Sequence, residues 1–357
     1  SDPRRLASLL ADLDLGDAVN RFALLYALQE SGREIAESPI RALRFAEEVL
    51  ARLRREPSGS DDGQPDAERI VPRLALLGQA HVLAGQACNW TSEYERAKAH
   101  FEVAYRSFAR AGCDEVSFAI VEYHESQRRS FIGRGLEGLV LARRAVATFE
   151  ALELEDLYAR AKATEGLALS KLGRPEDAIA AYRVALPVFV RGGLWSNYVG
   201  TLNSIGTALH RLGRLDEARR EYARALRCVS RERHRSFLAF IRHGLADVLF
   251  SAGHYREAAL SLAQASRLYY ECGLAASALK ASLFEIESWA RAGDVGRALR
   301  RLGVFRADVA RHRALDLSIA RQIEVALSGQ DPDFQRVAEL RLQAEGALGE
   351  RLGEIPA

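Results

Sequence analysis

The sequence predicts an all-α protein, a right-handed α-solenoid of about eight helix-turn-helix repeats. Five glycines, Gly133, Gly173, Gly213, Gly253 and Gly293, stand 40 residues apart. Four of them begin a Gly-x-x-x-x-Ala spacing, and the residues between successive glycines repeat a pattern of small and bulky side chains. A fixed period of this length is typical of solenoids, in which each unit buries its apolar face against its neighbours.

Each unit is predicted to contain two helices, as the unit over 195–230 illustrates. Leu202, Ile205 and Leu209 recur at helical spacing and form one apolar stripe. Gly213 ends this helix, because glycine adopts the left-handed conformation of a C-terminal cap without a Cβ clash. The acidic pair that follows favours the start of a second helix, since carboxylates stabilise the positive end of the helix dipole.

Four positions define the repeat: a small residue on the first helix, then alanine, a bulky residue and alanine on the second. The small residues let the two helices approach closely, and the bulky residue fills the wider space beside them. These positions hold Gly85, Ala97, Phe101 and Ala104; Ser126, Gly138, Ala142 and Ala145; Gly166, Ala178, Tyr182 and Ala185; Gly206, Ala218, Tyr222 and Ala225; and Ala246, Ala258, Leu262 and Ala265.

The same register extends over the whole chain, so residues 1–357 are predicted to form a single solenoid. Residues 1–55 form an N-terminal cap and first repeat, whose second helix is recognised by Pro39, Ala42, Ala46 and Val49. Residues 56–68, rich in turn formers, form a mobile inserted loop. Residues 69–313 contain six regular repeats, with Ser92 and Glu95 as a capping box. Residues 314–357 form a C-terminal capping repeat, with Ala326 and Ala338 at the repeat positions.

Composition favours a helical protein of the cytoplasm. Hydrophobic residues make up 48% of the chain and charged residues 27%, with no signal-peptide pattern and no run long enough to span a bilayer. Four scattered cysteines lack paired ligand spacing, which favours buried free thiols over disulfides or a metal site. The chain begins at Ser1 and contains no methionine. It is therefore interpreted as a fragment of a longer protein or as a processed product.

No motif indicates catalysis, a cofactor or a metal, and the chain is predicted not to be an enzyme. Residues 133–138 fit G-x-G-x-x-G, but that motif binds dinucleotides only where a strand meets a helix, and here Gly133 separates two helices. His124 and Glu125 have no third partner at catalytic or ligand spacing. Residues 61–66 lack the spacing of a calcium loop.

Nucleic acid is not a predicted partner of this chain. A basic cluster over 231–235 lies near Arg242, but 50 basic residues face 48 acidic ones, and a net charge of +2 is weak for phosphate binding. A solvated surface is the favoured interpretation, with a secondary contact to an acidic partner as the alternative. No membrane contact is predicted either.

The repeat pattern resembles the tetratricopeptide repeat family, most clearly in the units that begin near Glu155, Trp195 and Arg235. The period is 40 rather than 34 residues, so both helices are about a turn longer. This is similar to the long-repeat variants of kinesin light chains and bacterial regulators. The resemblance implies a binding module, often the sensor or docking part of a transcription activator, an anti-sigma-type regulator, a pheromone receptor or a caspase-like peptidase.

In stacked repeats of this kind the first helices line a concave surface, and their side chains that point away from the stack are the candidate binding residues. We expect a protein or peptide partner there, with a homodimer as an open alternative. A ligand-gated sensor that controls an attached effector is the rival hypothesis. Trp90, Tyr123 and Phe250 are candidate apolar anchors. The candidate groove residues are Asn89, Trp90, Tyr123, Gln127, Arg160, Lys171, Asn203, Thr207, His210, Arg211, His243, Asp247, Lys280 and Glu287.

Overall fold

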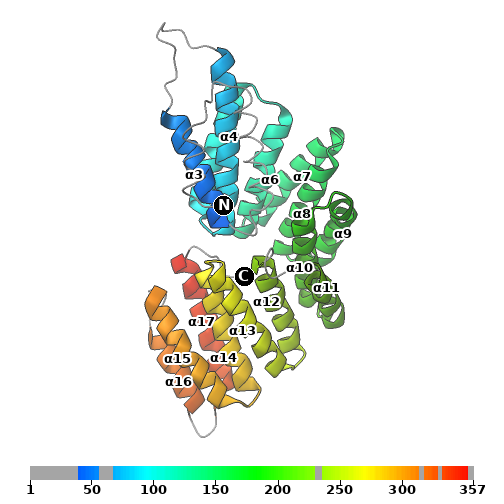
Figure 1. Cartoon of the computed structure of the whole chain (residues 1–357). Coiled ribbons are helices and arrows are strands. Elements are labelled where there is room, and N and C mark those ends of the chain that lie inside the picture. Colours follow the sequence, from blue (N-terminus) through cyan, green and yellow to red (C-terminus); the bar gives the residue numbers. More distant parts are fainter. Residues whose placement is uncertain (1–38, 56–66, 230–234, 313–316, 329–331, 353–357) are drawn as a thin grey trace. The chain divides into compact units, whose positions relative to one another are not determined.

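The computed structural model describes residues 39–55, 67–229, 235–312, 317–328 and 332–352 (Figure 1). Over these residues the chain forms fifteen α-helices and no strand, which confirms the all-α helical-repeat fold. They are α3 (Pro39–Arg55), α4 (Ala67–Trp90), α5 (Tyr94–Ala111), α6 (Glu115–Phe131), α7 (Gly135–Ala151), α8 (Glu155–Lys171), α9 (Pro175–Arg191), α10 (Trp195–Arg211), α11 (Leu215–Cys228), α12 (Arg235–Ser251), α13 (Tyr255–Glu271), α14 (Ala275–Arg291), α15 (Val295–His312), α16 (Leu317–Ser328) and α17 (Phe334–Leu352).

The described helices separate into two compact units. Unit 1 contains α3 to α8 and the second half of α9, and unit 2 contains the first half of α9 and α10 to α17. In unit 1 the pairs α4/α5 and α6/α7 pack together, as do α10/α11, α12/α13 and α14/α15 in unit 2. We call the even-numbered members of these pairs, together with α8, the first helices. The single solenoid over 1–357 stays a prediction.

The turns within the repeats follow the predicted glycines. All five have left-handed backbone, with φ between 71° and 81°. After α10, the N–H of Gly213 donates to the carbonyl of His210 (2.9 Å) and the N–H of Arg214 to that of Leu209 (3.0 Å), which satisfies carbonyls that the helix end leaves free. The helices predicted to begin near Glu155, Trp195 and Arg235 begin at those residues, and each is 17 residues long.

The predicted repeat positions are buried and packed as expected. In unit 2, Tyr222 is 1% exposed, and a Cβ on Gly206 would lie 2.8 Å from its ring. In unit 1, a Cβ on Gly85 would lie 2.5 Å from the ring of Phe101. Only a glycine leaves room for the aromatic ring at these places, which explains why a small residue on the first helix faces a bulky one on the second.

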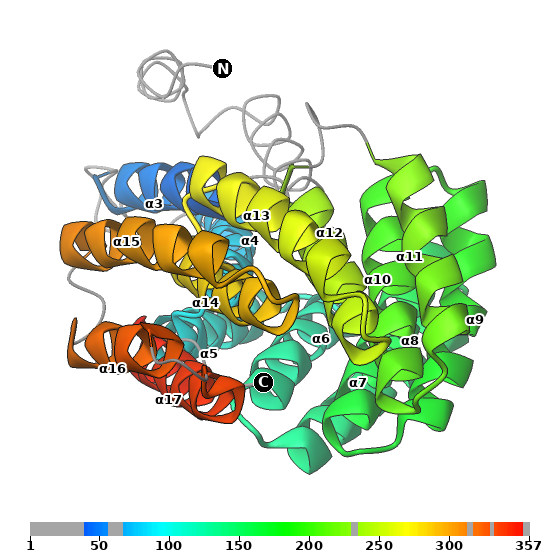
Figure 2. The same ribbon diagram turned by 90° about the horizontal axis from the view of Figure 1, so that it is seen from below.

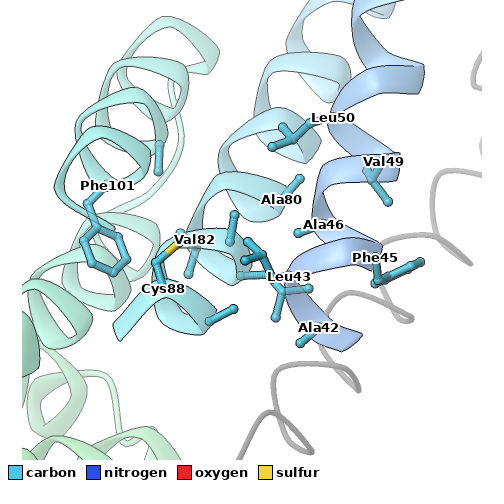
Figure 3. Close-up of a cluster of buried hydrophobic side chains, with 14 of the residues drawn as sticks. Ala42, Leu43, Phe45, Ala46, Val49, Leu50, Ala80, Val82, Cys88 and Phe101 are labelled. Carbon is cyan, nitrogen blue, oxygen red and sulfur yellow. The ribbon is translucent and has the colours of Figure 1, made fainter. Parts of the chain in front are cut away.

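The predicted second helix of the first repeat is also present, as α3. Ala46 and Val49 of α3 are fully buried, and Ala46 lies on the side toward α4, where Ala80 is fully buried too (Figure 3). Cys88 belongs to the same hydrophobic cluster, and its burial raises the pKa of the thiol to about 12. Cys88 is buried, as predicted for all four thiols, whereas Cys113, Cys228 and Cys272 are partly exposed.

Three details of the sequence prediction are wrong or fall partly outside the described residues. Ser92 is not a cap of α5, because it occupies the left-handed turn position (φ 63°) and Glu93 precedes the helix without a side-chain cap. Residues 67–68, assigned to the inserted loop, already belong to α4. The rest of that loop, residues 1–38 and most of the basic cluster at 231–235 lie outside the described residues.

The last helix pair departs from the predicted register. Ala326 and Ala338, expected at buried repeat positions, are partly exposed, whereas Leu327 and Val337 are 1% exposed. In this pair α17 packs against both α14 and α16, and α16 packs against α15, as Figures 1 and 2 show. The second helix of the pair thus lies beside a first helix of the preceding repeat.

Candidate functional site

All fourteen candidate groove residues lie on first helices. In unit 1 they belong to α4, α6 and α8, and in unit 2 to α10, α12 and α14. We call the side of these helices that carries them the first-helix face of each unit. Whether this face is concave stays a prediction.

In unit 1 several candidates connect one first helix to the next. The Nδ2 of Asn89 donates to the carbonyl oxygen of His124 (3.1 Å), joining α4 to α6. The Nε2 of Gln127 donates to Oγ1 of Thr164 (3.1 Å), joining α6 to α8. Tyr123 of α6 is buried, so it is part of the packing rather than an exposed anchor.

Other polar atoms on the face of unit 1 have no such partner. Asn89 Oδ1, His124 Nδ1 and Arg160 Nε are buried without a hydrogen bond among the described residues. Burial lowers the pKa of His124 to about 3, so this imidazole is neutral near pH 7. Lys171 is exposed at the end of α8, where its Nζ lies 5.9 Å from the centroid of the Phe131 ring. Trp90, partly buried, packs against the core of the unit.

In unit 2, α10 and α12 are joined at one end of the face. The Nε2 of His210 lies 2.8 Å from Oγ of Ser251, and Thr207 Oγ1 lies 3.0 Å from the hydroxyl of Tyr222. Asn203, one turn before Thr207, keeps its Oδ1 buried without a hydrogen bond in the described structure. Arg211 is exposed at the end of α10.

The middle of α12 carries two titratable candidates. His243 packs its ring against Tyr269 and Phe284, and burial lowers the pKa of this imidazole to about 4. Burial raises the pKa of Asp247 to about 6, against the opposing effects of His210 and Arg341. Phe250 lies against Phe284, with ring centroids 4.8 Å apart, so it contributes to packing between α12 and α14.

On α14 the carboxylate of the candidate Glu287 is already paired with two arginines. Glu287 is 1% exposed and accepts from Nε of Arg291 (2.9 Å) and from Nε of Arg341 on α17 (2.5 Å). Lys280, on the same helix, is partly buried. The sequence prediction missed Arg341, because 54 residues separate it from Glu287. The shifted stripe of α17 is the signal that would have placed it there.

Of the motifs set aside in the sequence, the structure describes residues 133–138 but not residues 61–66. Gly133 separates α6 from α7, and no strand precedes it within the described residues. Over the described ranges, no group of three His, Cys, Asp or Glu side chains is placed to hold a metal ion. None of the described helices is both long and apolar enough to cross a membrane.

Comparisons with known proteins agree with this repeat geometry. Residues 198–271 match the tetratricopeptide repeat family. No curated protein matches the sequence. Aspartyl phosphate phosphatase F from Bacillus subtilis has a similar structure, with a TM-score of 0.59 at 14% identity over 99% of this chain and 90% of that one.

Two further solved structures have similar folds. The Rap conjugation gene regulator of the plasmid pLS20, solved with the Phr* peptide, has a TM-score of 0.55 at 16% identity, over 85% of this chain and 83% of that one. A STAND protein with a tetratricopeptide repeat sensor, from Pyrococcus horikoshii, has a TM-score of 0.59 at 13% identity over 93% of this chain and 53% of that one. Residues 198–271 thus belong to the tetratricopeptide repeat family, and the described helices have the helical-repeat fold of these solved structures.

Proposed function

We propose that the chain is a binding scaffold, which holds a protein or peptide on its first-helix face and has no catalytic activity of its own. The observation that carries the proposal is the buried, unpartnered Oδ1 of Asn203 on α10. An unsatisfied buried polar atom costs about 1–3 kcal/mol, and a ligand that donates to it offsets that cost. The carboxamide of Asn203 also matches a peptide group, since each carries an N–H donor and a carbonyl acceptor.

Peptide recognition is supported further by the neighbouring groups. Asn89 and Arg160 in unit 1 also carry buried atoms without partners, on helices of the same kind. The exposed guanidinium of Arg211 suits a carboxylate of the ligand, because it presents several donors in one plane. The structural neighbour from pLS20 was solved with a peptide, Phr*. We infer that the chain is the regulatory or docking part of a bacterial signalling or transcription-regulatory protein.

The test is a double substitution of Asn203 and Arg211 by alanine. Peptides are first selected from a displayed library with the wild-type chain, and their dissociation constants are then measured for both proteins. We expect binding to weaken about tenfold or more without a fall in melting temperature, since Asn203→Ala removes a buried unsatisfied oxygen and Arg211 is exposed. The matched control replaces the exposed Arg219 and Arg220 of α11 by alanine and should bind as the wild type does. Equal binding by the Asn203/Arg211 variant would contradict the assignment of the face.

A second candidate is a ligand- or pheromone-gated sensor that controls an attached effector, such as a transcription activator or a caspase-like peptidase. It is favoured by the neighbour whose tetratricopeptide repeats form a sensor. A sensor must change conformation when its ligand binds one state more tightly than another. Small-angle scattering with a selected peptide at saturation should then differ from the unliganded profile. Identical profiles would leave the scaffold as the better description.

A further inference from the structure

The 40-residue period makes positions on successive first helices equivalent. Thr207, Asp247 and Glu287 are 40 residues apart, on α10, α12 and α14 of unit 2. Two of the three are carboxylates at the same position of their repeats. The partners of Glu287 therefore show which kind of group a carboxylate at this position binds.

Glu287 accommodates arginine. Its carboxylate holds Arg291 of its own helix and Arg341 of α17. The guanidinium of Arg341 also lies 4.6 Å from the ring centroid of Phe284, and that of Arg291 lies 5.4 Å from the ring centroid of Phe250. Charge and aromatic faces together suit a guanidinium, which is planar and weakly hydrated.

Asp247 has no such partner. The position equivalent to Arg291 is Ser251, whose hydroxyl contacts His210 instead. Among the residues that the structure describes, no hydrogen bond or ion pair engages the Asp247 carboxylate, although the charges of His210 and Arg341 act on it. A partly buried carboxylate without a partner is costly, and a cationic group from a ligand would offset the cost.

A second unsatisfied acceptor lies on the adjoining helix. Asn203 Oδ1 is buried without a partner on α10, which packs against α12. Tyr222 of α11 links the two helices, since its hydroxyl lies 3.0 Å from Oγ1 of Thr207 on α10 and within the electrostatic reach of Asp247 on α12. Both unsatisfied groups are acceptors, whereas a guanidinium carries five donors and no acceptor.

We propose that Asp247 on α12, together with Asn203 on α10, forms a subsite for an arginine side chain of the bound peptide. The subsite rests on the proposed peptide-binding function and specifies the ligand: a peptide that carries arginine. Inside the protein, Arg291 and Arg341 perform the same role at the equivalent carboxylate, Glu287. At Asp247 the ligand supplies the cation.

The experiment compares two blocked tripeptides, acetyl-Gly-Arg-Gly-amide and its citrulline analogue, which has nearly the same shape without the charge. Dissociation constants are measured with the 357-residue chain by nuclear magnetic resonance titration. We expect the arginine peptide to bind about tenfold more tightly, a difference of about 1.4 kcal/mol. Asp247→Asn should abolish this preference, whereas Asp216→Asn, an equal charge change at an exposed position of α11, should retain it. Equal affinities of the two peptides for the wild type, or no binding of the arginine peptide, would overturn the proposal.

A second variant tests the comparison with Glu287 directly. Ser251→Arg places an arginine where α14 has Arg291. Its guanidinium should pair with the Asp247 carboxylate, so the folded variant should lose the preference for the arginine peptide. A preserved preference in this variant would also overturn the proposal. Free L-arginine should bind more weakly than the tripeptide, because it lacks the flanking peptide groups; equal binding would contradict a peptide ligand. If selected peptides depend on Asn203 and Arg211 but bind equally with citrulline in place of arginine, the scaffold function stands and the arginine subsite fails.

Discussion

In unit 1 two polar side chains of the first helices hydrogen-bond to the next first helix, whereas in unit 2 one carboxylate of the first helices is paired with arginines and another is not. Asn89 and Gln127 each reach the next first helix, so they fix the stacking of α4, α6 and α8. In unit 2, Glu287 is saturated by two arginines, but Asp247 one repeat earlier is not. Equivalent positions of one repeat thus serve packing in one place and remain available for a ligand in another.

The largest effect on stability should follow from removing the carboxylate of Glu287. Glu287→Gln leaves Arg291 without its carboxylate and Arg341 with Glu345 alone, and removal of one member of a buried ion pair costs about 3 kcal/mol or more. Urea denaturation should show the loss. The control, Glu339→Gln, breaks an exposed pair with Arg336 and should change stability by less than about 0.5 kcal/mol. Two variants of equal stability would show that Glu287 does not hold α17 in place.

The next effect tests what the two units share, namely close packing of a glycine against an aromatic ring. Gly206→Leu would force side-chain atoms into the Tyr222 ring and should cost roughly 1–3 kcal/mol. Gly303→Leu is the matched control, because a Cβ at this exposed helical position meets nothing within 4 Å. Thermal unfolding of both variants is the measurement. If Gly206→Leu were as stable as the wild type, the assigned repeat register would be wrong.

How far the sequence predicts the structure differs between the middle and the ends of the chain. The starts of α8, α10 and α12 follow from the period, because each unit packs on a neighbour of the same pattern. The last described helix, α17, packs on α14 of the preceding repeat, and neither its register nor Arg341 could be inferred from the period.

The candidate site shows the same limit. The sequence places every candidate on a first helix correctly, since helical spacing alone fixes that. It does not distinguish Gln127, which bonds to Thr164, from Asn203, whose Oδ1 has no partner. That distinction depends on contacts between helices about 40 residues apart, which periodicity does not encode.

A smaller effect on stability, of opposite sign, should come from removing the charge of Asp247. The pKa of Asp247 is raised to about 6 by burial, so the folded state binds a proton more tightly than the unfolded chain, and stability falls as pH rises from about 4 to 6. His210 on α10 and Arg341 on α17 limit this loss, while the Tyr222 hydroxyl on α11 stays neutral. Asp247→Asn should therefore stabilise the protein by about 1–2 kcal/mol at pH 7, with no gain at pH 4. Melting temperatures across this range provide the measurement, and a loss of stability at pH 7 would show that Asp247 has a structural partner.

The smallest effect concerns a turn in which the two units differ. Glu153 adopts a left-handed backbone (φ 55°) between α7 and α8, at the position where Gly193 and Gly273 stand in later repeats. A side chain with this backbone is strained, whereas glycine is not, although glycine also increases the entropy of the unfolded chain. Glu153→Gly should therefore raise stability by about 0.5 kcal/mol, and Gly273→Ala should lower it by about 1 kcal/mol. Denaturation midpoints of the two variants give the comparison. If Glu153→Gly instead destabilised the protein, the Glu153 side chain would have to make contacts in unit 1 that outweigh the strain of its turn.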